Sequence, residues 1–259
     1  MKLDRLTLLS KIDIPFADLG ISIAHPSLKD IATIGEKDFF KGLKVLNLSK
    51  YNLGIDDKVD LDNITNFQIL MTMINSQDMK DLRQKIIEVL QLFFPYCDIK
   101  IDENFIFLIE KTDEGKVKTT GRLNEENYDE FTNVLRQMYA LDDKPEEEFN
   151  PANDATKKLI DKIKAGREKV RKQKNLQKQN EQSVLARYAS ILSISLNIDI
   201  NQILNYSVFQ LTDALQRSQL KTASDRWFNA CIAGASGLDE PEDWLKELEN
   251  WKEWIKLWV

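Results

Sequence analysis

Apolar residues recur along most of this chain at the three- and four-residue steps of amphipathic helices. Residues 28–46 follow this pattern with a break near Gly35, and two further helices are predicted over residues 64–74 and 82–93. A further helix follows Asn124, whose side chain is a suitable N-cap. The apolar face of that helix consists of Tyr128, Phe131, Leu135 and Met138.

Two segments alternate apolar and polar positions instead, which is the period of a strand. Residues 11–24 do so around a proline and a glycine, which predicts short strands. Residues 97–123 begin with alternating charge and isoleucine and continue with the β-rich run Phe105–Ile109, which predicts two or three antiparallel strands. The first 145 residues are therefore expected to form an α+β unit with a small antiparallel sheet.

The pattern changes at Pro145, where an acidic stretch and Pro151 indicate a boundary. Residues 146–182 keep only a thin apolar stripe among charged and amide side chains, so we expect a basic helical linker that buries one narrow face.

Residues 183–259 then turn apolar and are predicted to be helical. The run from Val184 gives one helix, and Asp199 followed by Gln202 resembles a capping box for a short one. Ser207 is a suitable N-cap for a long helix that ends before Gly234, and a last helix follows Pro241. The predicted fold is α+β and mainly α-helical, with an N-terminal domain (1–145), a linker (146–182) and a C-terminal helical domain (183–259).

Charge is distributed unevenly along the 259 residues, although the formal net charge is only -6. Residues 157–178 contain ten Lys and Arg against Asp161 and Glu168. This stretch is the candidate electrostatic patch, with the following members singled out: Lys162, Arg167, Lys169, Arg171, Lys172 and Lys174. No aromatic side chain is interleaved with them, so a solvated helix face or an acidic protein partner is favoured over nucleic acid.

The sequence contains no set of residues that would support catalysis or cofactor binding. His25 is the only histidine, and a structural role is favoured for it over catalysis. No Gly-rich phosphate loop is present, and the acidic cluster that begins at Asp56 lacks the spacing of a calcium loop. Cys97 and Cys231 stand far apart and are expected to be buried free thiols. We expect a protein that is not an enzyme and that holds no cofactor and no metal.

The last stretch of the chain carries an unusual set of tryptophans. Trp244, Trp251 and Trp258 are spaced by seven, and Trp254 lies beside them. One interpretation is that this helix face packs back on the rest of the protein. The other is a helix-in-groove or self-association surface, in which large aromatic side chains contribute most of the binding energy.

The sequence also bears on the compartment. The start of the chain lacks a long apolar core with a small-residue cleavage site, and no run of about 18 apolar residues occurs. We expect a cytoplasmic protein that does not associate with a membrane.

Three segments together resemble a family of tail assembly chaperones and tail-morphogenesis proteins encoded by phages of Gram-positive bacteria. These segments are EEEFNPANDATKKLIDKIKAGREKV (146–170), LARYASILSISLNIDINQILNYSVFQLTDALQR (185–217) and IAGASGLDEPEDWLKEL (232–248). Weaker likeness extends to HPSLKDIATIGEKDFF (25–40) and FIFLIEK (105–111).

The resemblance implies a non-enzymatic virion-assembly protein in the host cell cytoplasm that is absent from the finished particle. Such proteins bind the long, helical tape measure protein, recruit tail tube protein around it and can self-associate as a homo-oligomer. The residues expected to contact partners are Tyr188, Phe209, Trp227, Trp244, Trp251, Trp254 and Trp258. Two alternatives stay open: a structural tail or baseplate adaptor of the virion, and a nucleic-acid-binding accessory protein that uses the basic helix.

Overall fold

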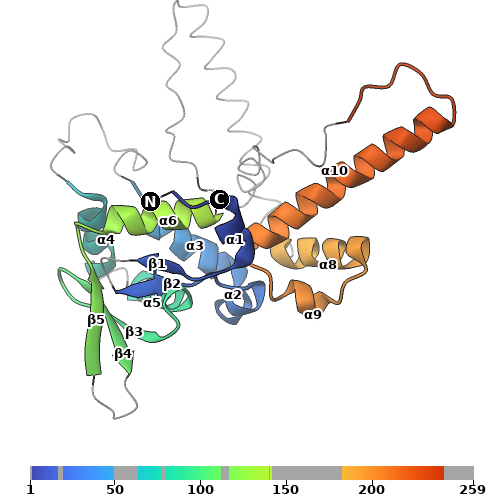
Figure 1. Ribbon diagram of the computed structural model, residues 1–259. Coiled ribbons are helices and arrows are strands. Elements are labelled where there is room, and N and C mark those ends of the chain that lie inside the picture. Colours follow the sequence, from blue (N-terminus) through green and yellow to red (C-terminus); the bar gives the residue numbers. More distant parts are fainter. Residues whose placement is uncertain are drawn as a thin grey trace, which may run out of the picture.

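A short helix, a β-hairpin, four helices, a three-stranded sheet and a further helix follow one another in the N-terminal part of the chain (Figure 1). The computed structural model describes residues 2–16, 20–49, 64–76, 80–111, 117–139, 141 and 183–241. Helices make up most of these residues, and the strands form two small antiparallel sheets. The predicted α+β, mainly helical fold is confirmed.

The chain begins with a short helix, α1 (Arg5–Ser10), and a two-stranded hairpin. Asp4 caps α1 by accepting a hydrogen bond from the Thr7 backbone N–H, a signal that hydrophobic periodicity alone overlooks. Strands β1 (Ile14–Phe16) and β2 (Ile21–Ile23) are antiparallel, as the alternation of residues 11–24 predicts. Their inward side chains belong to the core.

Four helices follow the hairpin at the predicted places: α2 (Leu28–Ile34), α3 (Glu36–Leu46), α4 (Asn66–Asn75) and α5 (Lys80–Phe93). Capping boxes start α2 at Ser27 and α4 at Thr65. Gly35 separates α2 from α3 with a φ of 88°, a conformation that side chains other than glycine rarely adopt. The predicted break near Gly35 is therefore confirmed.

The second sheet has the order β3-β4-β5, with β3 (Cys97–Ile101), β4 (Ile106–Lys111) and β5 (Val117–Leu123) antiparallel throughout. Helix α6 (Tyr128–Tyr139) follows it and runs across the molecule from α4 toward α10 (Figure 1). Aromatic rings meet in the core, where Phe94, the residue after α5, stacks on Phe131 of α6 with ring centroids 5.7 Å apart. The buried Tyr128 hydroxyl donates to the Leu46 carbonyl at 2.6 Å, and its burial raises the Tyr128 pKa.

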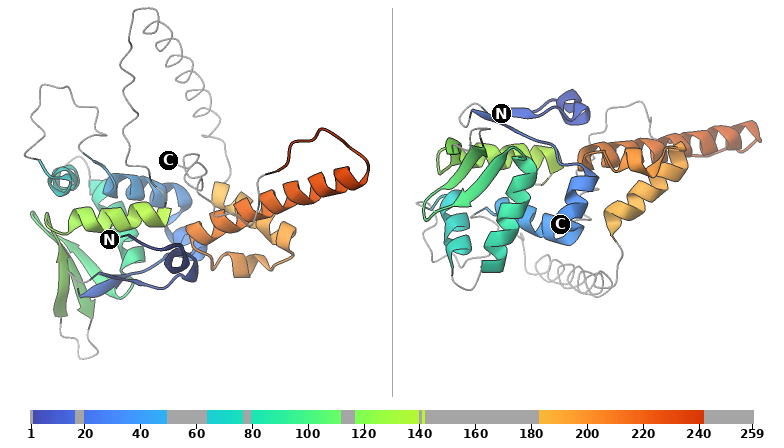
Figure 2. Two further views of the ribbon diagram at one scale, coloured as in Figure 1. Left: turned by 45° about the horizontal axis from the view of Figure 1, so that its top comes forward. Right: turned by 90° about the horizontal axis from the view of Figure 1, so that it is seen from below.

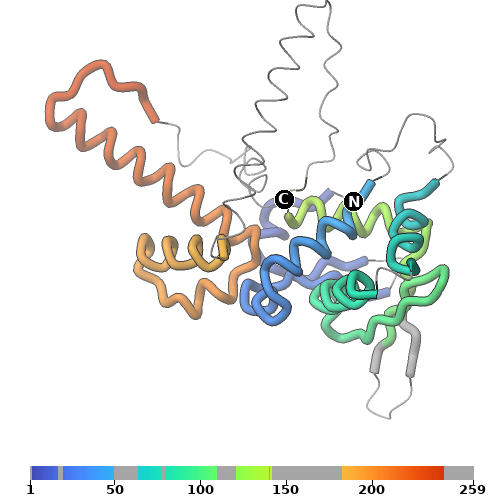
Figure 3. Tube along the Cα trace, turned by 180° about the vertical axis from the view of Figure 1, so that it is seen from behind, coloured from blue at the N-terminus to red at the C-terminus, as the bar shows by residue number. Residues whose placement is uncertain are grey.

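The C-terminal helices are α8 (Val184–Leu196), α9 (Ile200–Ile203) and α10 (Val208–Ile232). They lie at the opposite end of the molecule from the three-stranded sheet, and α10 extends well beyond its neighbours (Figures 2 and 3). Leu185 and Leu192 of α8 and Leu211 of α10 belong to the same buried cluster as the N-terminal core residues. The core is thus continuous across the predicted boundary, and a division into independently folding domains stays a prediction.

Some sequence expectations need correction, and others lie outside the described residues. Cys97 is buried, but Cys231 is exposed because it lies on the projecting end of α10. Asp199 caps α9 through the Asn201 backbone N–H and not through a box with Gln202. Three predicted features fall outside the described ranges: the acidic cluster that begins at Asp56, the basic helical linker (146–182) and the final tryptophan-rich helix.

Candidate interaction surface on the C-terminal helices

Backbone hydrogen bonds fix the start of α10 against the start of α2. Ser27 and Ser207, each the cap of its own helix, pair as an antiparallel bridge. Beside them the Leu28 N–H donates to the Tyr206 carbonyl and the Lys29 N–H to the Leu204 carbonyl, both at 2.9 Å. The direction in which α10 leaves the core is therefore set by paired backbone groups.

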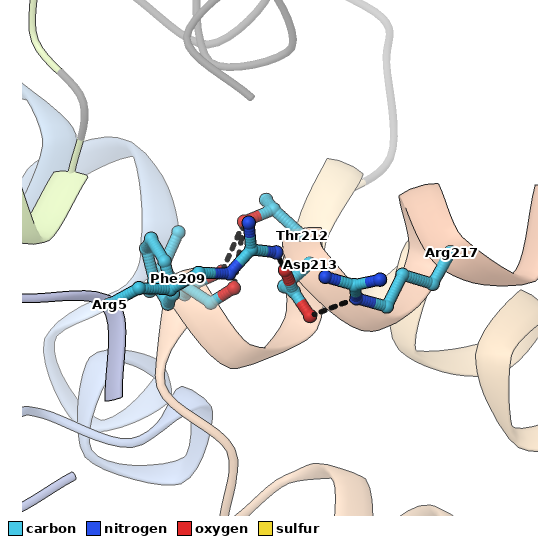
Figure 4. Close-up of polar contacts among 6 residues, drawn as sticks. Arg5, Phe209, Thr212, Asp213 and Arg217 are labelled. Carbon is cyan, nitrogen blue, oxygen red and sulfur yellow. Dashed lines mark hydrogen bonds and ion pairs between the residues drawn. The ribbon is translucent and has the colours of Figure 1, made fainter. Parts of the chain in front are cut away.

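A charged network around Asp213, about one and a half turns into α10, holds the same helix (Figure 4). The Asp213 carboxylate, whose side chain is 11% exposed, accepts from Arg5 of α1 and from Arg217 one turn on in α10. Gln210 adds a hydrogen bond to the Leu9 carbonyl at 2.7 Å. The hydroxyl of Thr212, which is also buried, donates hydrogen bonds to backbone carbonyls within α10. These contacts join α1 to the base of α10.

Helix α8 is positioned by a carboxylate from α3. Glu36 accepts a hydrogen bond from the Ser183 hydroxyl and from the backbone N–H groups of Val184 and Leu185. These are N–H groups at the start of a helix, which have no partner within it and which favour a negative charge. The carboxylate thus completes the N-terminus of α8 and ties it to the core.

Helix α8 is apolar on more than the face that it buries. Leu185, Ala189 and Leu192 pack into the core, whereas Ile194 on the far side is 83% exposed and Ile191 is 43% exposed. The apolar surface continues over the turn into α9, where Leu196 and Ile200 are also exposed. Apolar residues gathered on one surface are typical of a site that binds another protein.

A groove runs between α8 and the middle of α10. It is lined by Ile191, Ser195, Leu215, Ser218, Gln219, Thr222, Ala223 and Arg226. Its volume is about 280 Å³, below the roughly 300–1,000 Å³ of small-molecule pockets. Its α10 wall runs from Leu215 to Arg226, which corresponds to about 17 Å of helix. A shallow, elongated and largely uncharged groove suits a helix better than a small molecule.

The structure separates the residues that the sequence singles out as partner contacts. Tyr188 packs against the core while partly exposed, with the Arg187 guanidinium 5.7 Å from its ring. Phe209 is 4% exposed and belongs to the core, so it offers no surface in this conformation. Trp227 lies on the projecting part of α10 and is partly buried. The remaining predicted contact and patch residues, Trp244, Trp251, Trp254, Trp258, Lys162, Arg167, Lys169, Arg171, Lys172 and Lys174, lie outside the described residues.

Sequence reasoning missed that Ile194, Leu196 and Ile200 would be exposed. The signal was present, because α8 carries more apolar side chains than one helix face can hold. A helix that is apolar nearly all round is buried on all sides or binds a partner. The sequence could not distinguish these two outcomes without knowing what packs on the second face.

Two other features are absent from the described part of the chain: a cluster of metal ligands and a membrane-spanning helix. No group of three or more His, Cys, Asp or Glu side chains there is placed to hold a metal ion. None of the helices within the described ranges is long and apolar enough to cross a membrane.

Comparisons with known proteins give no relative. No family model, curated protein or solved structure matches this chain.

Proposed function

We propose that this protein is a non-enzymatic tail assembly chaperone that binds helices of a tape measure protein in the groove between α8 and α10. The observation that carries the proposal is this groove, which is lined by the 43% exposed Ile191 of α8, a helix on which Ile194 is also 83% exposed. A client helix that lies in the groove and over α8 removes Ile191 and Ile194 from water, and burial of apolar side chains is the main driving force of helix-in-groove binding.

The fit to a helical client follows from the dimensions and the chemistry of the surface. The α10 wall offers about three helical turns of contact, and one serine, one threonine and one alanine along it allow a close approach of backbones. Only Arg226 contributes a full charge to the lining. The likeness of residues 185–217 to tail assembly chaperones covers α8 and the first turns of α10, and so includes Ile191, Ser195 and Leu215 of this groove. Recruitment of tail tube protein is part of the same proposal.

The test is co-expression with the tape measure protein of the same genome. We expect the client to become more soluble and to elute with this protein from a sizing column. Ile191→Glu with Ile194→Glu places two carboxylates on the surface, and the expected loss of affinity is at least about ten-fold, because burying one such side chain is worth about 1.5–3 kcal/mol.

A matched control introduces the same glutamate substitution at an exposed position away from the groove. Tyr96, which is 79% exposed and lies between α5 and β3, is changed to Glu, and binding should be retained. If the client stays insoluble and no complex elutes, the proposal fails. Detection of the protein by mass spectrometry in purified particles would favour the structural tail or baseplate adaptor instead.

A further inference from the structure

The outer part of α10 extends beyond the core. Leu215 is its last buried residue, and residues 216–232 continue for about 26 Å as a helix (Figure 2). Phe228 is 59% exposed and Ile232 is 71% exposed on this part. Single helices of this length are marginally stable in water without a packed face. Helix α8 lies across the groove from residues up to Arg226, so it is the opposite side of the projecting part of α10 that calls for a second element.

One side of this projection has the spacing of a helix–helix seam. Its members follow one another at steps of three, four, three and four residues: Arg217, Leu220, Ser224, Trp227 and Cys231. Leu220, Ser224 and Trp227 are partly buried, whereas the residues between them are exposed. The Trp227 Nε1 atom is buried without a hydrogen-bond partner in the described structure. We call these five residues the α10 seam, and it lies on a different side of the helix from Thr222 and Arg226 of the groove.

The end of the chain has the complementary pattern. Residues 233–241 turn back at the tip of α10 through Gly234 and Gly237, both with positive φ (Figure 1). After them the bulky apolar residues follow at steps of four, three, four and three: Trp244, Leu248, Trp251, Ile255 and Trp258. Residues 242–259 lie outside the described residues, and as a helix they would be about 27 Å long, close to the length of the projection.

An antiparallel register aligns the two patterns at every position. Cys231 meets Trp244, Trp227 meets Leu248, Ser224 meets Trp251, Leu220 meets Ile255, and Arg217 meets Trp258. Small side chains oppose two of the tryptophans, which allows large rings to fill the seam. An arginine opposes the last tryptophan, a favourable pair for a cation–π contact.

We infer that residues 242–259 dock antiparallel on the α10 seam of the same chain and form a helical hairpin with α10. The connection of nine residues, 233–241, keeps the segment near its seam at an effective concentration in the millimolar range. A second copy would have to compete with this tethered segment. The hairpin leaves the opposite side of α10, which faces the groove, free for a client.

Crosslinking in the full-length protein tests the register. Leu220→Cys is combined with Ile255→Cys, in a chain where Cys231→Ser removes the exposed native thiol and Cys97 stays buried. Under mild oxidation this pair should form an intramolecular disulfide at least about ten-fold faster than Leu220→Cys with Glu253→Cys, because Glu253 would lie on the far side of the docked helix. Equal rates in the two pairs, or disulfide-linked dimers, would overturn the inference.

Hydrogen exchange gives a second test that does not depend on disulfide geometry. Trp251→Ala should speed amide exchange across residues 217–232 by roughly ten-fold or more, while amides of residues 208–215 in the core keep their protection. Glu253→Ala should change neither. Unchanged exchange in the tryptophan variant would contradict docking. Client binding is tested through Ile191 and Ile194 on another surface, so the hairpin and the proposed function can fail separately.

Discussion

His25 shows how one buried side chain can set the pH dependence of this fold. The side chain is 4% exposed, and its Nε2 atom is buried with no hydrogen-bond partner in the described structure. Burial lowers the His25 pKa below 6.5, and the nearby Lys11 acts in the same direction. Asp13 and a backbone hydrogen bond at Ile12 oppose this effect without reversing it.

Stability should therefore fall as the pH drops below 6.5. In that range the unfolded chain binds a proton at His25 more readily than the folded chain does, so protonation favours unfolding. Urea unfolding at pH 7.5, 6.5 and 5.5 measures the effect, which can reach about 1.4 kcal/mol per pH unit for one proton. His25→Gln should flatten this part of the curve, and since the chain has one histidine no other imidazole contributes. If the free energy of unfolding depended on pH in the same way in the parent and in His25→Gln, this assignment would be refuted.

At the scale of the elements, the close approach of α3 and α5 depends on a glycine. A Cβ atom added at Gly42 would lie 2.6 Å from Cγ2 of Val89, which is fully buried on α5. Val89 is β-branched and has little freedom to rotate within a helix. The ion pair between Lys85 and Asp38 joins the same two helices. Gly42 is thus needed for helix packing, although glycine is a poor helix former.

Gly42→Ala should destabilise the protein. Overpacking costs about 1–3 kcal/mol, whereas the better helix propensity of alanine returns roughly 0.8–1.0 kcal/mol, so the expected net loss is up to about 2 kcal/mol. In a Val89→Ala background the clash is absent, and the same change should stabilise by about 1 kcal/mol. Denaturant unfolding of the parent, the two single variants and the double variant measures the effect of Gly42→Ala in each background. A stabilising effect in the parent protein would show that α3 and α5 are not in tight contact at Gly42.

On the scale of the whole molecule, residues that are distant in the sequence share one core. Leu185, Leu192 and Leu211 from the C-terminal helices join the buried cluster of the N-terminal part. The Asp213 network then ties α1 to α10 across more than 200 positions of the chain. Because α1 contacts α10 directly, loss of this network is expected to weaken the whole structure as well as one helix.

Asp213→Ala should lower the free energy of unfolding by about 1.5–3 kcal/mol, since it removes charge-assisted hydrogen bonds from a mostly buried carboxylate. Asp225→Ala is the matched control on the same helix. Its pair with Lys221 is also one helical turn apart, but both side chains are more than half exposed, so the expected loss is about 0.3–0.5 kcal/mol. Thermal and denaturant unfolding measure the difference. Equal losses for the two variants would contradict a structural role of the Arg5–Asp213–Arg217 network.

Local sequence signals specify most of the helices and strands of this protein. The helices from α2 to α6, the two sheets and the cap of α10 at Ser207 all follow from local signals: apolar period, capping side chains, glycine and proline. These signals act over a few residues, so they can be read without knowing the neighbours. Short α1 was missed because six residues hold too little periodicity.

Which apolar faces are covered depends on how the helices pack together. Phe209 and Ile194 are both large apolar residues on predicted helices, yet the first is core and the second is 83% exposed. The difference arises because α2 and α1 fix the base of α10, and Glu36 fixes the start of α8. Burial depends on contacts between distant segments, which no local pattern records. For the same reason the groove between α8 and α10 could not be predicted, although the residues that line it belong to helices that the sequence predicts.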